Sequence, residues 1–475
     1  MRISGKELNA TEGPLLGKII RYVIPLMLTH MLQVFYSVAD MMVVDLSNEA
    51  DAVGAVGTTI PFVNLIINLC IGFATGTTVV LGHALGARDE EGSSRTVHTS
   101  VLLSLGLGII GAVIGISLSR PILSVMGATG SVLDLATTYI NIYLLGLPFI
   151  AVSTYIAAIF RTVGKANIPL YGALVCGAVN LGMNIFFIKV CSMSVDGVAL
   201  ATLIANVLST VIYLFFILRE KGSCRLSFKK LCFDRKIAKK IFKAGLPVGM
   251  QSTLMSLCNM YVQSSVLAIN NLLTPEGATF QPVIKGDSAV ANLEYLAYSG
   301  VSACFSASIV FTGQNYGAKR IERIPRVYGI CTLLSVSITA LLCGIMLLLN
   351  EPLLSLYGVY KGAEGTAEAL AYNSAMTRFM LCTFSKIIVA VSEVGVGCSR
   401  GLGKATAPTV IDLACQGIFP VLWCLTIFPA FETLVALYLL YPVSRALSAI
   451  SQTLLANISL KKCKASFTYS PAKEA

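Results

Sequence analysis

The stretch Arg161-Thr-Val-Gly-Lys-Ala-Asn-Ile-Pro169 recurs as Arg400-Gly-Leu-Gly-Lys-Ala-Thr-Ala-Pro408, with five of nine positions identical. Both copies lie in a chain made almost wholly of long apolar runs. Self-similarity at this spacing indicates that a hydrophobic unit of about half the chain occurs twice.

The composition of the chain indicates lipid as its solvent. Of its 475 residues, 55% are hydrophobic and 12% are charged, and the mean hydropathy is +0.78. Water-soluble domains typically have about 25% charged residues. The start of the chain is polar, and the first apolar run, from Ile19, is too long for a signal peptide. We therefore expect this run to stay in place as a membrane anchor.

Apolar runs of about 20 residues, the length that crosses the hydrocarbon core, predict twelve membrane spans. They lie near residues 19–46, 56–81, 97–119, 133–160, 169–190, 197–218, 244–271, 288–312, 327–349, 367–399, 408–430 and 432–457. The predicted fold class is an all-α integral membrane protein.

Basic residues orient the predicted spans, because cytoplasmic loops keep an excess of Lys and Arg. One set of loops holds only four of the 35 basic residues, whereas ten lie between Arg219 and Lys243. Both termini are therefore predicted to face the cytoplasm. The net charge of +11 reflects this asymmetry, and the basic stretch is interpreted as a connector lying on anionic lipid, not as a nucleic-acid site. The predicted organisation is a cytoplasmic N-terminus (1–18), an N-lobe (19–218), a basic connector (219–243), a C-lobe (244–457) and a cytoplasmic tail (458–475).

The duplication extends beyond the first motif. Gly82-His-Ala-Leu-Gly-Ala-Arg88 matches Gly313-Gln-Asn-Tyr-Gly-Ala-Lys319, and Lys18 to Pro25 resembles Lys240 to Pro247. Six spans return each unit to the side where it started, so the two six-helix repeats are predicted to be parallel. Duplicated membrane units of this kind are the usual architecture of secondary transporters.

These loops and their order resemble those of the multidrug and toxic compound extrusion (MATE) transporters, in their bacterial DinF- or NorM-like branch. The resemblance rests on the two motif pairs and on Asn180-Leu-Gly-Met-Asn184, and it spans roughly residues 15–457. It implies two six-helix lobes that form a V. It also implies export of amphipathic, often cationic compounds in exchange for protons or sodium ions.

Asp40 is the first candidate for cation coupling. Ionisable groups in the bilayer core cost about 2.5–3.5 kcal/mol on insertion scales, so they are rare and usually functional. Asp40 lies within the first span, toward its outer end, and its counterpart in the second repeat is Val262. A carboxyl there would bind and release a proton in each cycle, as the resemblance also implies. The alternative is an interfacial carboxylate near the helix end.

Asn180 and Asn184, spaced i and i+4, place two amides on one helix face. They form either a polar wall opposite Asp40 or a hydrogen-bonded contact between helices. Many members of the resembled family carry Asp where this chain has Asn184, and an amide cannot titrate. This difference favours protons over sodium. By the same resemblance, Tyr139 and Thr202 match polar positions of the amino-terminal pocket.

The span 367–399 carries Arg378, Lys386 and Glu393 on one face of an ideal helix. We expect this face to line a cavity, because facing lipid would be costly. Lys386 and Glu393 are bridgeable by water, Glu393 is a possible second coupling acid, and Glu294 is expected to neutralise Arg378 or Lys386. Asp412 is assigned to the first turn of a helix, where the helix dipole favours an acid. No partner is predicted for Arg445.

Motifs that suggest enzymes fail on their context. Gly397-Cys-Ser-Arg-Gly401 fits G-x-S-x-G, but no strand precedes it, and Gly106 to Gly111 fits G-x-G-x-x-G inside a predicted span. No H-E-x-x-H and no C-x-x-C pair occurs. We therefore expect no enzymatic activity, no catalytic residue, no metal site and no cofactor apart from H⁺ or Na⁺ as the coupling ion.

The sequence thus predicts a monomeric, proton-coupled exporter of amphipathic or cationic drugs in a bacterial plasma membrane, with no nucleic-acid partner. Three alternatives stay open. A lipid-linked oligosaccharide flippase of the same superfamily would use Arg378 and Arg445. A major facilitator transporter shares the 6+6 arrangement but lacks its loop motif here. An intramembrane enzyme is disfavoured by the missing catalytic pairs.

Overall fold

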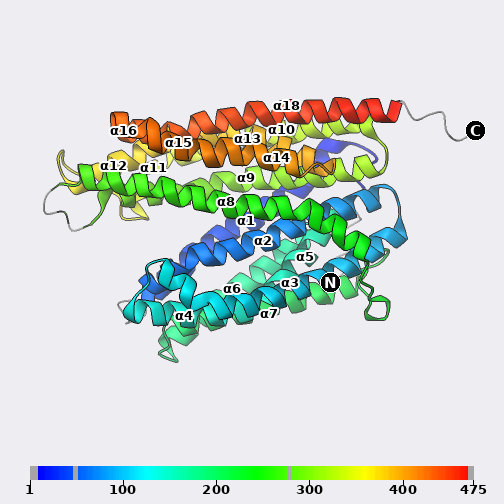
Figure 1. Ribbon diagram of the computed structural model, residues 1–475, viewed down its shortest axis with the longest axis horizontal. Coiled ribbons are helices and arrows are strands. Elements are labelled where there is room, and N and C mark those ends of the chain that lie inside the picture. The colour runs from blue at the N-terminus through cyan, green and yellow to red at the C-terminus, as the bar shows by residue number, and fades with distance from the viewer. Residues whose placement is uncertain (1–8, 46–51, 276–277, 279, 469–475) are drawn as a thin grey trace, which may run out of the picture. The chain divides into compact units, whose positions relative to one another are not determined.

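The computed structural model describes residues 9–45, 52–275, 278 and 280–468, with side chains left out at 37–45, 52–53 and 467–468. Every regular element in this part of the chain is a helix (Figure 1). The first half contains α1 (Leu15–Asp45), α2 (Ala52–Gly86), α3 (Glu90–Val125), α4 (Gly130–Leu145), α5 (Leu147–Thr162), α6 (Asn167–Lys189), α7 (Val195–Leu218) and η1 (Phe228–Lys230). The second half contains α8 (Arg235–Leu273), α9 (Pro282–Gly317), η2 (Ile321–Arg323), α10 (Ile324–Leu348), α11 (Asn350–Ser355), α12 (Ala367–Arg378), η3 (Phe379–Thr383), α13 (Phe384–Gly401), α14 (Thr406–Asp412), η4 (Leu413–Ile418), α15 (Phe419–Thr426), α16 (Phe428–Phe431), α17 (Leu434–Tyr438) and α18 (Leu440–Thr468).

Among the described residues, ten helical segments are long and apolar enough to cross a membrane, and α4 with α5 adds an eleventh. The remaining predicted span corresponds to α8, which falls outside this set because Asn, Gln and Ser side chains are spread along it. The predicted span 133–160 is broken in the structure, because α4 and α5 meet at a bend of 49°. Pro148 follows Gly146 at this point, and a proline lacks the N–H that would continue the helical ladder.

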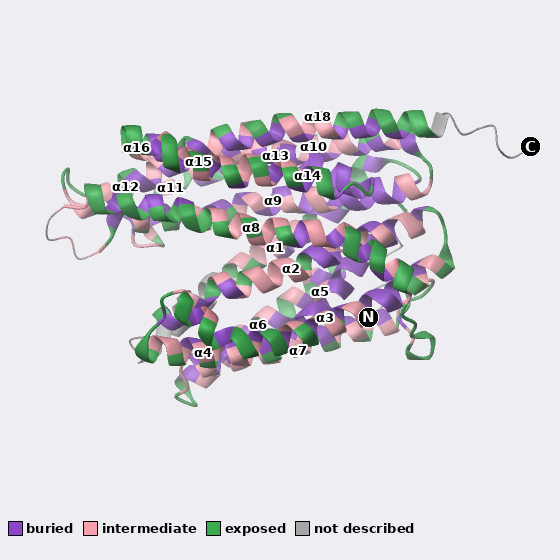
Figure 2. Cartoon of the chain, in the orientation of Figure 1, coloured by how far each residue is buried: buried purple, intermediate pink, exposed green. Residues whose placement is uncertain are grey.

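The chain forms two compact units. The N-unit holds the described residues 9–14, 20–252 and 313–319, and the C-unit holds 15–19, 253–312 and 320–468. Each unit has its own buried core, and Figure 2 shows exposed residues along the outer side of α18 in the C-unit. Large apolar side chains are exposed on α3 at Ile110 and Val113 and on α10 at Leu333 and Leu341, as expected for surfaces that contact lipid. The predicted lobe boundaries stay a prediction.

The repeated Arg-x-x-Gly-Lys motif ends a helix in the same way in both halves. Gly164 follows α5 and Gly403 follows α13, with φ of 85° and 81° respectively. The N–H of Lys165 donates to the carbonyl of Phe160 at 2.8 Å, and the equivalent bond from Lys404 is 3.0 Å. These bonds define a Schellman cap, in which only glycine adopts the left-handed backbone without strain. The motif is therefore repeated because it stops equivalent helices.

The second repeated motif brings two backbones close together within the N-unit. A Cβ at Gly86 of α2 would lie 2.0 Å from the carbonyl oxygen of Gln314, and one at Gly317 would lie 2.1 Å from that of His83. Each copy then turns through a basic residue with positive φ, which is 56° at Arg88 and 58° at the equivalent lysine. The second glycine of the Gly-x-x-x-Gly-Ala pattern, in each copy, thus allows close helix packing.

Candidate functional site

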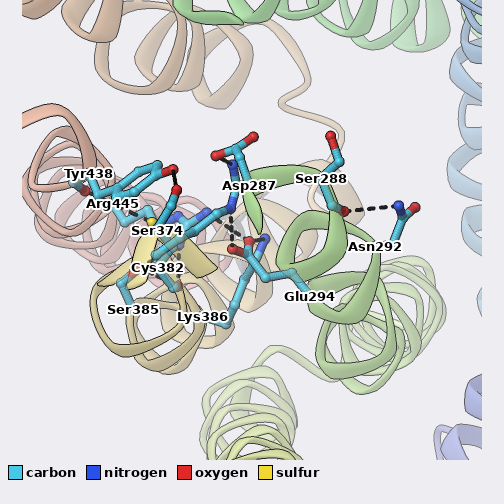
Figure 3. Close-up of polar contacts among 11 residues, drawn as sticks. Asp287, Ser288, Asn292, Glu294, Ser374, Cys382, Ser385, Lys386, Tyr438 and Arg445 are labelled. Atoms are coloured by element: carbon cyan, nitrogen blue, oxygen red, sulfur yellow. Dashed lines mark hydrogen bonds and ion pairs between the residues drawn. The ribbon is translucent and has the colours of Figure 1, made fainter. Parts of the chain in front are cut away.

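A buried charge cluster lies in the C-unit, with the carboxylate of Glu294 on α9 at its centre (Figure 3). The Nε of Arg378 donates to Glu294 Oε1 at 3.2 Å, and the Nζ of Lys386 donates to Oε2 at 2.9 Å. Arg445 Nη2 lies 3.6 Å from the same Oε2. The pairing predicted for Glu294 is confirmed for both residues, and the prediction that left Arg445 without a partner is corrected.

The two arginines of the cluster have further partners. Arg378 Nη1 donates to Asp287 Oδ1 at 2.5 Å. Asp287 lies about two helical turns before Glu294 on α9. Arg445 Nη1 donates to the carbonyl oxygen of Cys382 at 2.6 Å and to the hydroxyl of Ser385. A buried charge is tolerated when it is paired and hydrogen-bonded, so these contacts explain how α18 carries an arginine into the core.

A π-helical segment positions two of the cations. α12 ends at Arg378, residues Phe379–Thr383 form η3, and α13 carries Lys386 two residues after its start. The wider turn of a π-segment changes the angular spacing of side chains along the helix, and such segments are frequent at functional sites. The carbonyl of Cys382 that receives Arg445 belongs to η3. This turn lies between Arg378 and Lys386, which both reach Glu294.

The cluster lines a cavity of about 380 Å³ that lies wholly within the C-unit. Glu294, Arg378, Lys386 and Arg445 contribute to its wall, and Tyr298 and Tyr441 present rings to the cations. The Lys386 Nζ lies 5.8 Å from the centre of the Tyr298 ring, and the Arg445 guanidinium lies 5.1 Å from that of Tyr441. Val262, the counterpart of Asp40 in the second repeat, also lines the cavity.

The predicted polar residues of the N-unit form a second, uncharged group. Asn184 Nδ2 on α6 donates to Asn180 Oδ1, and Asn180 Nδ2 donates to Thr202 Oγ1 on α7, each at 3.4 Å. Both asparagines are buried. Tyr139 on α4 stacks on Tyr143, with ring centres 6.3 Å apart. Three predicted residues therefore come together in one hydrogen-bonded chain.

Asp40 belongs to α1, but its side chain lies outside the described part of the structure. The nearest described aromatic residue on α1 is Tyr36, whose hydroxyl donates to the carbonyl of Leu174 on α6 at 3.4 Å. A Cβ at Gly177 would lie 1.9 Å from the Tyr36 ring. The missing side chain of Gly177 thus allows α1 to pack against α6 one turn before Asn180.

The surroundings of two further acids, Glu393 and Asp412, differ from those expected from the sequence. Glu393 does not line the cavity, and the direct ion-pair partner of Lys386 among the described residues is Glu294. Asp412 is not in a first turn, because α14 begins at Thr406 and ends at this residue. Asp412 Oδ1 instead accepts bonds from Ser448 Oγ and Gln452 Nε2, both at 2.9 Å. These donors, and not the N-terminus of a helix, are its hydrogen-bond partners.

Asp287, Tyr298 and Tyr441 were not predicted as site residues. The predicted span began at residue 288, whereas α9 begins at Pro282 and includes Asp287. The available signal was the spacing of seven between Asp287 and Glu294, which places two acids on one helix face.

Comparison with known proteins decides the family. The MatE family model matches residues 25–186 and 286–425. The chain belongs to the MatE family. Members of this family are membrane transporters, so the expectation that this chain is no enzyme is confirmed, and the resemblance found in the sequence is confirmed with it.

Similar proteins include the probable multidrug resistance protein YoeA of Bacillus subtilis (strain 168), which is 24% identical over 90% of both chains. The multidrug export protein MepA of Staphylococcus aureus (strain MRSA252) is 22% identical over 52% of this chain and 55% of that protein. The bacterial relatives support a plasma-membrane location for this multi-pass MatE chain.

Solved structures confirm the fold class. The outward-facing structure of a multidrug resistance MATE family transporter of the MOP superfamily has a TM-score of 0.87 at 20% identity, over 97% of this chain and 99% of that one. A MOP superfamily transporter from Pyrococcus furiosus Vc1 gives the same values. The all-helical, two-repeat membrane architecture of the MatE chain follows from this likeness.

Proposed function

We propose that this MatE protein exports amphipathic, cationic drugs in exchange for protons, with Asp40 as the coupling carboxyl. The observation that carries the proposal is the buried chain of Asn184, Asn180 and Thr202 in the N-unit. Polar side chains at this depth need partners inside the protein, and a neighbouring carboxyl supplies one whose hydrogen bonding changes with its protonation.

Helix register supports this placement of Asp40. Tyr36 packs over Gly177, and Asp40 and Asn180 follow these residues by four and three positions respectively. Consecutive spans alternate in direction, so α1 and α6, the first and fifth spans, run the same way. One helical turn beyond the Tyr36 contact therefore brings Asp40 to the level of Asn180.

The other polar residues favour protons as the coupling ion and the N-unit as the place where coupling occurs. Glu294 already has three cationic partners, so discharging it would leave their charges unbalanced. Asn184 carries no charge, and a sodium site there would lack an anionic ligand. In the proposed cycle, a proton from outside neutralises Asp40, rearranges its hydrogen bonds with Asn180 and Asn184, and favours drug release.

Efflux of a fluorescent cation from everted vesicles tests the proposal. The wild type is compared with Asp40→Asn under an imposed pH gradient and, separately, a sodium gradient, with Asp45→Asn as the matched control on the same helix. We expect Asp40→Asn to abolish proton-driven efflux and Asp45→Asn to retain it. Full proton-driven efflux by Asp40→Asn, or wild-type efflux driven by sodium alone, would contradict the mechanism.

A lipid-linked oligosaccharide flippase is the second candidate function, because Arg378 and Arg445 line the C-unit cavity. This alternative gains support if vesicles containing the protein flip a lipid-linked pyrophosphate and fail to export the cation. We further propose a monomer with both termini in the cytoplasm. Reporter fusions at each terminus and the mass of the solubilised protein test these two points.

A further inference from the structure

We propose that the C-unit cavity binds an oxyanion, a carboxylate or phosphate carried by an amphipathic molecule. This site is separate from the coupling group proposed for the N-unit. It rests on the charge balance, the donors and the wall of the cavity of about 380 Å³ that contains Lys386.

The charge balance of the cluster leaves one cation in excess. Three cations, Arg378, Lys386 and Arg445, make ion pairs with only two carboxylates, Asp287 and Glu294. Within the described residues, no third acid lies within ion-pair distance of these cations. Charge that direct ion pairs leave unmatched is costly in a membrane core, so an anion that enters the cavity would be stabilised by the cations on its wall.

The excess charge faces the cavity. Asp287 is 1% exposed and does not line the wall, so it balances the charge of Arg378 from outside the cavity. The wall itself presents three cations and one carboxylate. Lys386 is the most accessible of the three cations, with 16% of its side chain exposed, compared with 7% for Arg378 and 8% for Arg445. An incoming anion is therefore expected to contact Lys386.

Neutral groups on the wall match an amphipathic anion. The amides of Asn259 and Gln263 on α8 and the hydroxyl of Ser444 can donate to oxygen atoms. Val262 and Tyr295 supply apolar surface beside them. A volume of this size is at the small end of known ligand pockets. It suits a charged head group together with a short apolar part of the same molecule.

Binding of radiolabelled decanoate to the full-length protein in phosphatidylcholine nanodiscs tests the proposal. Its uncharged amide, decanamide, is the matched probe, and empty nanodiscs correct for partition into lipid. We expect decanoate to bind about tenfold more tightly than decanamide, as one charge-assisted contact would give. We expect Lys386→Gln to weaken decanoate binding by about tenfold and Lys386→Arg to retain it.

Lys386→Gln leaves Glu294 paired with Arg378 and Arg445, so the remaining acid and the remaining cations still have partners of opposite charge. Lys361→Gln, which removes an exposed cation paired with Glu351 in the same unit, is the control and should bind decanoate as the wild type does. Equal binding of decanoate and decanamide, or unchanged decanoate binding by Lys386→Gln, would overturn the proposal.

The same assay identifies the source of the oxyanion. Nanodiscs that also contain phosphatidylglycerol supply an anionic head group within the bilayer. If decanoate is displaced from the wild type, the site takes a lipid phosphate; if it is retained, the site selects a diffusible amphiphile. Asp40→Asn should bind decanoate normally while losing proton-driven efflux, so the site and the coupling mechanism can fail independently.

Discussion

Replacing Glu294 with glutamine should destabilise the C-unit more than any other single change in its charge cluster. Glutamine has almost the same shape, so packing is retained while the counter-ion of three cations is lost. Removing one partner of a buried ion pair typically costs about 3–5 kcal/mol, because the remaining charge stays uncompensated. Glu294 is 3% exposed, so solvent screens little of this cost.

Replacing Lys386 with glutamine should cost less, although it breaks the same 2.9 Å contact. Glu294 keeps Arg378 and Arg445 as partners, and the new amide can still donate a hydrogen bond. We expect a loss of about 1.5 kcal/mol, the lower end for a hydrogen bond to a charged group. The double variant removes one charge of each sign. It should be about 1–2 kcal/mol more stable than Glu294→Gln alone, because neighbouring sites are not additive.

Trp423 provides the measurement, because it is the only tryptophan of the chain. Its Nε1 donates to the carbonyl of Ala436 at 2.9 Å, so its fluorescence reports on the folding of the C-unit. Unfolding is followed in nonionic micelles as the fraction of sodium dodecyl sulfate rises. If Glu294→Gln is no less stable than Lys386→Gln, the charge-balance reasoning fails.

Three smaller predictions concern backbone geometry and one partly buried acid. Gly177→Ala places a Cβ against the Tyr36 ring and should cost about 1–3 kcal/mol of unfolding free energy, with Tyr36→Ala restoring stability in the double variant. Gly403→Ala, at φ 81°, should cost about 1–2 kcal/mol, whereas Gly182→Ala in open space on α6 should not destabilise; thermal unfolding compares them. The pKa of Asp234 is held below its ordinary value of 3.8, because two backbone N–H groups at the start of α8 donate to its carboxylate. The stability that it contributes is therefore present above about pH 4 and is lost as the pH falls through the lowered pKa. Hydrogen-exchange protection of the first turn of α8 should fall as the pH drops below about 4, and Asp234→Asn should remove this pH dependence.

The fold was predictable because the bilayer limits the choices. Apolar runs must be helices when no water is available to the backbone, and their lengths are set by the thickness of the hydrocarbon. The repeat was also readable, since Gly164 and Gly403 occupy a left-handed backbone position where other residues would be strained. A backbone conformation that requires glycine can therefore be predicted from the sequence at that position.

The charge cluster was only partly predictable, because helix periodicity assumes a regular helix. The π-segment between Arg378 and Lys386 changes their relative angle, and no residue type marks its position. The partner of Arg445 includes a backbone carbonyl, that of Cys382, which has no signature in the sequence. Asp287 was missed because a charged residue near a predicted span end was assigned to the loop.

The two repeats place different chemistry on the same scaffold, and this difference bears on where coupling occurs. The position of Asp40 in the first repeat is occupied by Val262 in the second, where the nearby charges are already balanced by partners except for one cation. An acid surrounded by cations resists losing its charge, since its partners would then be left unpaired. An acid beside neutral amides loses its charge at much lower cost, and the hydrogen-bonded amides of Asn180 and Asn184 are the neighbours that we propose for Asp40 in the first repeat. Proton exchange is therefore expected in the N-unit and anion recognition in the C-unit, and separate loss of efflux in Asp40→Asn and of decanoate binding in Lys386→Gln would show that division.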